Sequence, residues 1–143
     1  MKEPAFWDTS ALLFLCTNQP TKRDVEELFQ LYEIVAWWAT PVEARSSLAR
    51  LVRMSEIDLD QRDKAIDRFE ELRTDWTEID PSELLRNIAE DLPDRFSLRA
   101  GDALQLAAAY TWAMQRPAGR RFISGDRRLL DSAEQLGFRT IAV

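Results

Sequence analysis

The chain has 143 residues, a hydrophobic fraction of 45% and a formal net charge of −6 at pH 7. This length fits one domain with a real apolar core, so we expect residues 1–143 to form a single domain. The sequence contains no histidine and one cysteine, Cys16, which excludes Ser-His-Asp and Cys-His catalysis, the usual zinc sites and an intramolecular disulfide.

The first quarter of the chain predicts two strands and two helices. Residues 4–7 are expected to form a short buried strand, and residues 11–16 a compact apolar helix. Residues 33–38, rich in β-branched and aromatic side chains, predict a second strand. Between them we expect a helix after Pro20 with one apolar face, formed by Val25, Leu28, Phe29 and Tyr32.

The middle of the chain predicts three helices and a short strand. Thr40, Pro41 and Glu43 have the spacing of a capped helix start, with Thr40 as cap and Glu43 closing a capping box. A longer helix is expected over residues 58–74 and a strand over 76–79. Asp80 is expected to open another helix in the same capping style.

The last third predicts a buried helix, two strands and a final helix. We expect the helix over residues 98–115, the strands over 121–124 and 138–143, and a helix over 126–136 that Gly137 ends. Strands that alternate with helices favour an α/β fold, a central mostly parallel sheet with helices on both faces. In such sheets functional groups gather at the carboxyl ends of the strands.

Three acidic residues are expected near those strand ends. Asp8 follows the first strand and Asp126 the fourth, and Glu43 opens the helix after the second. Each has a structural alternative, because Asp and Glu also serve in helix caps. For Asp8 the two roles are compatible, and for Glu43 taken alone the capping role is favoured.

Asp102 has a different setting. It precedes a stretch, residues 103–114, that carries no charge at all. An ionised group on so apolar a helix is costly unless it is paired or binds a metal. The structural alternative is a salt bridge to Arg45 or Arg99, and we favour a functional role.

The four carboxylates could meet in one crevice. They could not all remain ionised there without a compensating cation. Oxygen ligands without His or Cys select Mg²⁺ or Mn²⁺, which can activate water for phosphodiester hydrolysis.

The sequence resembles the PIN-domain ribonucleases, specifically the VapC toxins of toxin–antitoxin pairs. Four segments carry the likeness, in order along nearly the whole chain: Trp-Asp-Thr-Ser-Ala-Leu (7–12), Val-Glu-Ala-Arg-Ser-Ser-Leu-Ala-Arg (42–50), Gly-Asp-Ala-Leu-Gln-Leu-Ala-Ala-Ala (101–109) and Phe-Ile-Ser-Gly-Asp-Arg-Arg-Leu-Leu (122–130). The resemblance implies a three-layer α/β/α sandwich and a metal-dependent endoribonuclease. It also implies inhibition by a cognate antitoxin and a homodimer, for which apolar positions on the first helices would supply the surfaces.

The resemblance also implies residue roles. Asp8, Glu43, Asp102 and Asp126 would be the catalytic residues and hold the divalent metal, with the last acidic position the most variable in the family. Thr9 and Ser124 match hydroxyl positions that support the site.

Arginines supply most of the positive charge, 16 of the 19 basic residues. Five of them lie between residues 116 and 128 with a single acid, Asp126. Arginine binds phosphate in a bidentate manner, so Arg127 and Arg128 are the best RNA-contact candidates, although solvated surface charge is the favoured explanation for any single arginine.

Two other functions remain open. A PIN-like module could bind RNA or a protein without cutting, and would not need the carboxylate set. A phosphohydrolase or receiver-type α/β protein also gathers Asp at strand ends, but usually needs a nearby lysine, and Lys2, Lys22 and Lys64 are poorly placed. We expect a cytoplasmic protein, because no segment resembles a signal peptide or a membrane span.

Overall fold

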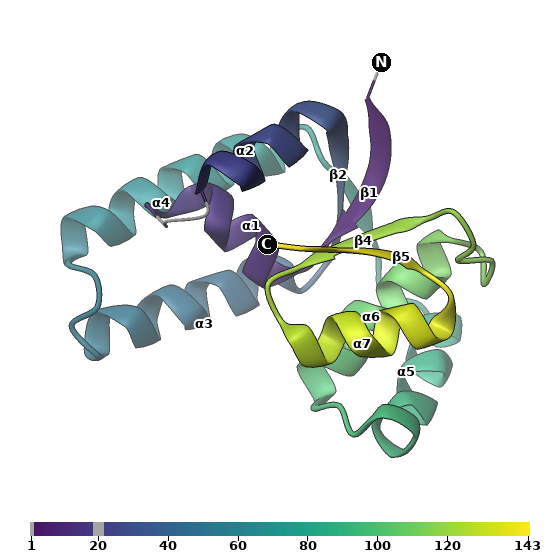
Figure 1. Cartoon of the computed structure of the whole chain (residues 1–143). Coiled ribbons are helices and arrows are strands. Elements are labelled where there is room, and N and C mark those ends of the chain that lie inside the picture. Colours follow the sequence, from purple (N-terminus) through teal and green to yellow (C-terminus); the bar gives the residue numbers. More distant parts are fainter. Residues whose placement is uncertain (1, 19–21) are drawn as a thin grey trace.

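The computed structural model describes residues 2–18 and 22–143, and within them five strands and seven helices (Figure 1). The strands are β1 (Glu3–Trp7), β2 (Tyr32–Trp37), β3 (Thr77–Ile79), β4 (Arg121–Ser124) and β5 (Arg139–Ala142). The helices are α1 (Thr9–Cys16), α2 (Lys22–Leu31), α3 (Thr40–Arg53), α4 (Leu59–Arg73), α5 (Glu83–Phe96), α6 (Ala100–Trp112) and α7 (Arg127–Leu136).

All five strands run parallel, in the spatial order β3-β2-β1-β4-β5. The central strand β1 therefore lies between the strands that precede α3 and α7. Phe6 pairs with Val35 on one side and with Phe122 on the other. The parallel sheet expected from the alternating pattern is confirmed.

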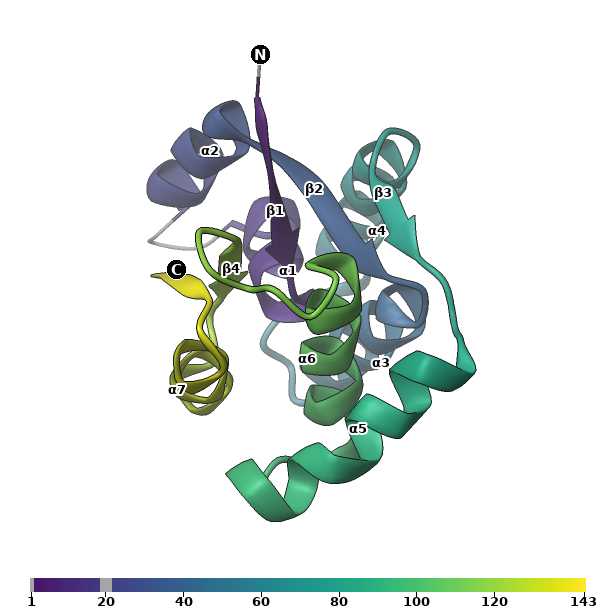
Figure 2. The same ribbon diagram turned by 90° about the vertical axis from the view of Figure 1, so that its right-hand side faces the viewer.

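Side chains alternate across the sheet and build one apolar layer on each face. Ala5 and Trp7 point toward α1, α2, α3 and α4, whereas Phe6 points toward α5, α6 and α7. The two groups of helices lie on opposite sides of the strands in both ribbon views (Figures 1 and 2). The three-layer α/β/α sandwich is confirmed.

Two predicted helix caps are wrong. Helix α3 has Ala39 as its N-cap, and no side chain caps it. Ala39 already has helix-like dihedral angles, φ −85° and ψ −2°, so Thr40 lies inside the helix and its hydroxyl is free for another partner. Helix α5 is capped by Ser82, whose hydroxyl accepts from the Leu85 N–H, and not by Asp80.

Other boundaries shift by a few residues. Tyr32 begins β2, paired with Glu3, and does not continue the apolar face of α2. Helix α6 ends at Trp112, and the chain then turns through positive φ at Met114 and Gln115. Gly137 ends α7 with φ 114°, as predicted. Pro20, the expected start of the second helix, lies outside the described residues.

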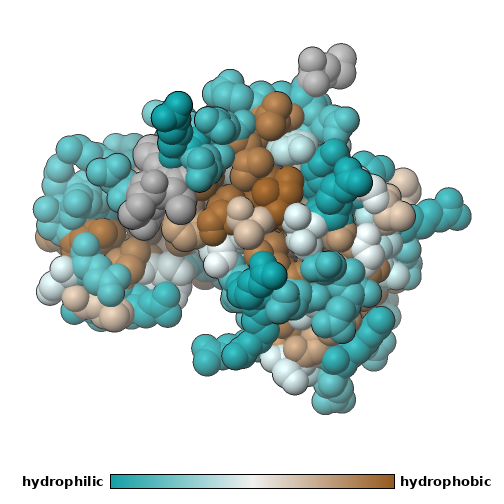
Figure 3. Space-filling model, viewed as in Figure 1, coloured by the Kyte–Doolittle hydropathy of each residue, from teal (hydrophilic) through white to brown (hydrophobic). Residues whose placement is uncertain are grey.

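None of the helices in the described residues is long and apolar enough to cross a membrane. Apolar side chains do gather on one face, over the middle of the molecule where α2 and the C-terminal strand lie (Figure 3). Hydrophilic side chains surround this area.

Candidate active site

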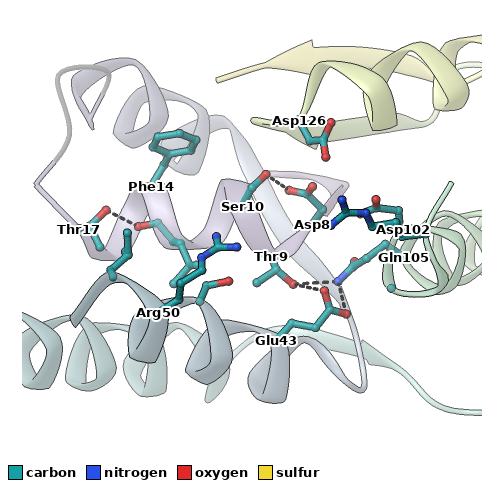
Figure 4. Close-up of a pocket in the computed structure, with 15 residues that line it drawn as sticks. Asp8, Thr9, Ser10, Phe14, Thr17, Glu43, Arg50, Asp102, Gln105 and Asp126 are labelled. Carbon is teal, nitrogen blue, oxygen red and sulfur yellow. Dashed lines mark hydrogen bonds between the residues drawn. The ribbon is translucent and has the colours of Figure 1, made fainter. Parts of the chain in front are cut away.

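A cleft of about 520 Å³ lies where the parallel strands end (Figure 4). All four carboxylates singled out from the sequence line it: Asp8, Glu43, Asp102 and Asp126. Three of them follow neighbouring strands, because Asp8 comes after β1, Glu43 lies in the first turn of α3 after β2, and Asp126 comes after β4. Asp102 reaches the same cleft from the first turn of α6.

Asp8 is almost fully buried and is the N-cap of α1. Its Oδ1 accepts hydrogen bonds from the Ala11 N–H at 2.9 Å and the Ser10 hydroxyl at 2.7 Å, and its Oδ2 accepts one from the Ser124 hydroxyl. Burial raises the pKa of Asp8 to about 6, and the charge of Asp126 adds to the rise while the hydrogen bonds oppose it. Both interpretations of Asp8 therefore hold: it caps a helix and it faces the cleft.

Glu43 does not close a capping box. Its Oε1 accepts from the Gln105 amide at 3.2 Å, and its Oε2 accepts from the Thr9 hydroxyl at 3.3 Å. Burial raises the pKa of Glu43 to about 7, with contributions from the charges of Asp8 and Asp102. The carboxylate is thus held in the cleft by residues from two other helices.

Asp102 forms none of the salt bridges proposed as its structural alternative. Arg45 pairs with Glu70 at 3.8 Å, and Arg99 makes no ion pair with Asp102 in the described residues. The pKa of Asp102 is raised, chiefly by burial and then by the charge of Asp126, while the charges of Arg99 and Arg128 lower it.

Asp126 caps α7, accepting from the N–H groups of Arg128 at 2.9 Å and Leu129 at 3.3 Å. The Ser124 hydroxyl connects it to Asp8, because this oxygen accepts from the Asp126 N–H at 2.9 Å and donates to Asp8. Ser124 therefore supports two of the candidate ligands at once.

A side chain at position 125 would not fit beside the Phe14 ring as it stands, whereas the backbone conformation of Gly125 does not itself need glycine. A Cβ at this position would overlap the ring of Phe14, which also lines the cleft. The Gly125 N–H donates to the Ser10 hydroxyl at 2.8 Å, which ties the turn after β4 to α1.

The possible metal ligands in the cleft are carboxylate oxygens, which suit a hard divalent cation. Within the described residues, however, no three acidic or cysteine side chains are close enough together to form a ready-made metal site. Hydrogen bonds from Ser10, Ser124, Thr9 and Gln105 hold carboxylate oxygens that a cation would also use. Except for Oδ1 of Asp8, which accepts two hydrogen bonds, each of these oxygens keeps a second lone pair for the cation, and the ligand role of the four residues stays a prediction.

Comparison with known proteins shows a shared fold. No protein-family model matches the chain, and no curated protein matches it significantly in sequence. Several solved structures resemble it, among them three at 16–17% identity. PAE2754 from Pyrobaculum aerophilum has a TM-score of 0.67 and 17% identity, covering 98% of this chain and 92% of that one.

The other two structures have similar coverage. FitAcB from Neisseria gonorrhoeae has a TM-score of 0.63 and 17% identity, covering 96% of each chain. A toxin–antitoxin complex from Klebsiella pneumoniae has a TM-score of 0.58 and 16% identity, covering 85% of this chain and 86% of that one. Likeness at this level of identity shows a common three-layer fold.

The structure adds polar residues to the cleft that the sequence did not single out. Arg50 and Arg99 line it, as does Gln105. Gln105 interrupts an apolar helix sequence, which was a usable signal. The arginines gave none, because their approach to the cleft depends on how α3 and α6 pack. Arg127, a predicted RNA contact, pairs with Asp131 at 3.5 Å.

Proposed function

We propose that this chain is a metal-dependent endoribonuclease that acts as the toxin of a toxin–antitoxin pair. The observation that carries the proposal is the convergence of Asp8, Glu43, Asp102 and Asp126 on one cleft at the ends of neighbouring parallel strands. Burial and then the charge of a neighbouring carboxylate raise the pKa of Asp8, Glu43 and Asp102, an arrangement that is unfavourable without a cation. The fold likeness to a toxin–antitoxin complex supports the biological role.

The four carboxylates would hold Mg²⁺ or Mn²⁺. Such a cation, when bound, lowers the pKa of a coordinated water and offsets phosphate charge, which is the chemistry of phosphodiester hydrolysis. Asp8 and Asp126 are supported by Ser124, and Glu43 by Thr9 and Gln105.

Arginines on two walls of the cleft would bind the RNA backbone. Arg50, in the last turn of α3, and Arg99, the residue before α6, are exposed and form no ion pair with the described residues. Their guanidinium groups can each bind a phosphate in a bidentate manner. Arg128 is a further candidate, since its charge already acts on Asp102.

Protein partners would cover exposed apolar side chains. On the first helices, α1 directs Leu12 and Leu15 into the core, whereas Leu31 at the end of α2 is 59% exposed. Trp38, Val42 and Leu84 are at least half exposed, at 53%, 70% and 50%. We propose that a cognate antitoxin, a second copy of the chain, or both, cover such side chains.

RNA cleavage by the purified chain tests the activity. We expect cleavage with Mg²⁺ or Mn²⁺, none with excess chelator, and recovery when the cation is restored. The Asp8→Asn variant, purified identically, controls for contaminating nucleases. Cleavage that persists unchanged in chelator would exclude the mechanism, and absence of cleavage on any RNA would favour a binding module.

A further inference from the structure

Gln105 is a buried polar residue at the back of the cleft. It lies on α6 with only 2% of its surface exposed, among the small apolar residues of a tightly packed helix. Asp102 lies three residues earlier, so the two side chains share one face of the helix. An uncharged amide inside an apolar helix is unfavourable unless its hydrogen bonds are made.

The Gln105 amide joins α6 to two other helices (Figure 4). The two hydrogens on its Nε2 are shared among three acceptors: the hydroxyl of Thr9 at 2.9 Å, the hydroxyl of Thr40 at 3.0 Å and Oε1 of Glu43 at 3.2 Å. Thr9 in turn donates to Oε2 of Glu43 at 3.3 Å. Gln105 therefore contacts Glu43 both directly and through a hydroxyl.

The orientation of the amide serves Glu43. Oε1 of Gln105 is buried without a hydrogen-bond partner among the described residues. Rotating the amide by half a turn would place that oxygen against the Glu43 carboxylate, where two acceptors would repel. The observed orientation leaves one buried oxygen unpaired, which lowers stability, but it directs the N–H donor of the amide at Glu43.

Glu43 has few other restraints. Its carboxylate passes close to the first turn of α6, since a Cβ on Gly101 would lie 3.9 Å from Oε2. Gln105 and Thr9 supply the hydrogen bonds to its carboxylate in the described residues. A long side chain of this kind loses rotational freedom when it binds a cation, and prior restraint lowers that cost.

We propose that Gln105 is a positioning residue that holds the Glu43 carboxylate in place for divalent cation binding. The inference rests on the proposed function, because it assumes that the cleft binds Mg²⁺ or Mn²⁺. Thr40 belongs to the same hydrogen-bond network, since its buried hydroxyl accepts from the amide and fixes the side chain of Gln105.

The test is direct measurement of Mn²⁺ and Mg²⁺ affinity by titration calorimetry on the full chain, without RNA. Gln105→Met keeps the length of the side chain and removes the donor. We expect its affinity to fall by about 10- to 100-fold, the usual effect of losing a group that orients a metal ligand. Gln105→Asn withdraws the amide by one methylene and should also bind more weakly, which keeps the test available if the first variant folds poorly.

Leu106→Val is the matched control. Leu106 is the next residue on α6, fully buried in the core on the other face of the helix. This variant loses packing but no polar group of the cleft, so its metal affinity should equal that of the wild type even if its melting temperature falls. Equal losses of affinity in Leu106→Val and Gln105→Met would show a purely structural role.

The outcomes separate the two proposals. A wild-type chain that binds the cations and a Gln105→Met variant that binds them equally well would overturn the positioning role alone. A wild-type chain that binds neither cation would overturn the proposed function and this inference with it.

Discussion

At the scale of single residues, the cleft is an assembly of charges that the fold places against one another. Asp102 shows this most clearly, because it is half-buried and forms no ion pair in the described part of the chain. Burial and then the charge of Asp126 raise its pKa more than the charges of Arg99 and Arg128 lower it. A residue that merely stabilised the helix would be expected to have a partner.

Asp102→Asn should separate a structural role from a functional one. The substitution keeps the shape and removes one of the repelling charges, so the melting temperature of the metal-free protein should hold or rise. RNA cleavage should nevertheless fall by orders of magnitude, about 100-fold or more, because the cation is lost or misplaced.

Melting and cleavage are measured on the same preparation. Asp94→Asn, an exposed acid on α5 that does not line the cleft, is the control for loss of one negative charge. A large drop in the stability of Asp102→Asn with cleavage retained would make Asp102 structural.

The raised pKa values of Asp8 and Glu43 predict how stability depends on pH. Their folded values, about 6 and about 7, exceed the ordinary values of 3.8 and 4.5, so the folded protein binds protons more tightly than the unfolded chain. Their favourable contribution to the free energy of unfolding is therefore fully present below about pH 4 and is lost as pH rises through about 7.

The metal-free protein, kept in chelator, should melt at a lower temperature at about pH 8 than at about pH 5.5. Glu43→Gln should flatten this dependence, because it removes the group with the larger raised value. A melting temperature that rises with pH over this range, equally in both proteins, would contradict the assignment.

At the scale of elements, three parallel strands determine where the site lies. The strands β2, β1 and β4 are neighbours, and each is followed by a helix. A carboxylate of the cleft lies at the N-cap or in the first turn of each of these helices. The N-cap residues of α1 and α7, Asp8 and Asp126, therefore combine a structural and a candidate chemical role. A helix N-terminus also favours negative charge.

Two variants of Asp126 should separate these roles. Asparagine is as good an N-cap as aspartate, so Asp126→Asn should leave stability nearly unchanged, whereas Asp126→Ala should lose about 1 kcal/mol. Both should reduce RNA cleavage if the carboxylate holds the cation.

The control is Asp58→Ala, which removes a similar cap from α4 outside the cleft. It should lose comparable stability, about 1 kcal/mol, and keep its activity. Full cleavage by Asp126→Asn would show that Asp126 is only a cap.

Much of this architecture could be predicted from the sequence, because strand positions, helix periodicity and the three-layer order follow from local patterns. The starts of α3 and α5 could not be predicted in detail, and the predicted caps Thr40 and Asp80 are wrong. Local spacing fits a capping box at Thr40 and Glu43, yet both side chains bind Gln105, which lies more than 60 residues away. The contributions of Arg50 and Arg99 to the cleft likewise depend on the packing of α3 and α6.

At the scale of the whole molecule, the proposed function requires an acidic protein to bind a polyanion. The net charge is −6, which argues against bulk attraction to RNA, so the proposed binding would come from local arginines around the cleft, strengthened by the charge of a bound cation. Such a protein would not coat nucleic acid but would engage one phosphodiester region at a time. This is the behaviour expected of an enzyme and not of a packaging protein.

Growth of cells that express the chain tests the toxin role. A catalytic toxin needs few molecules, so modest expression of the wild type should slow growth, while Asp102→Asn at equal abundance should not. Because this variant should keep its fold and its binding surfaces, the comparison separates cutting RNA from merely holding it. Co-expression of the proposed cognate antitoxin should restore growth, and the purified pair should form a complex that no longer cleaves RNA. Normal growth with abundant folded wild-type protein would refute toxicity, and equal inhibition by wild type and Asp102→Asn would point to a binding module that blocks RNA without hydrolysis.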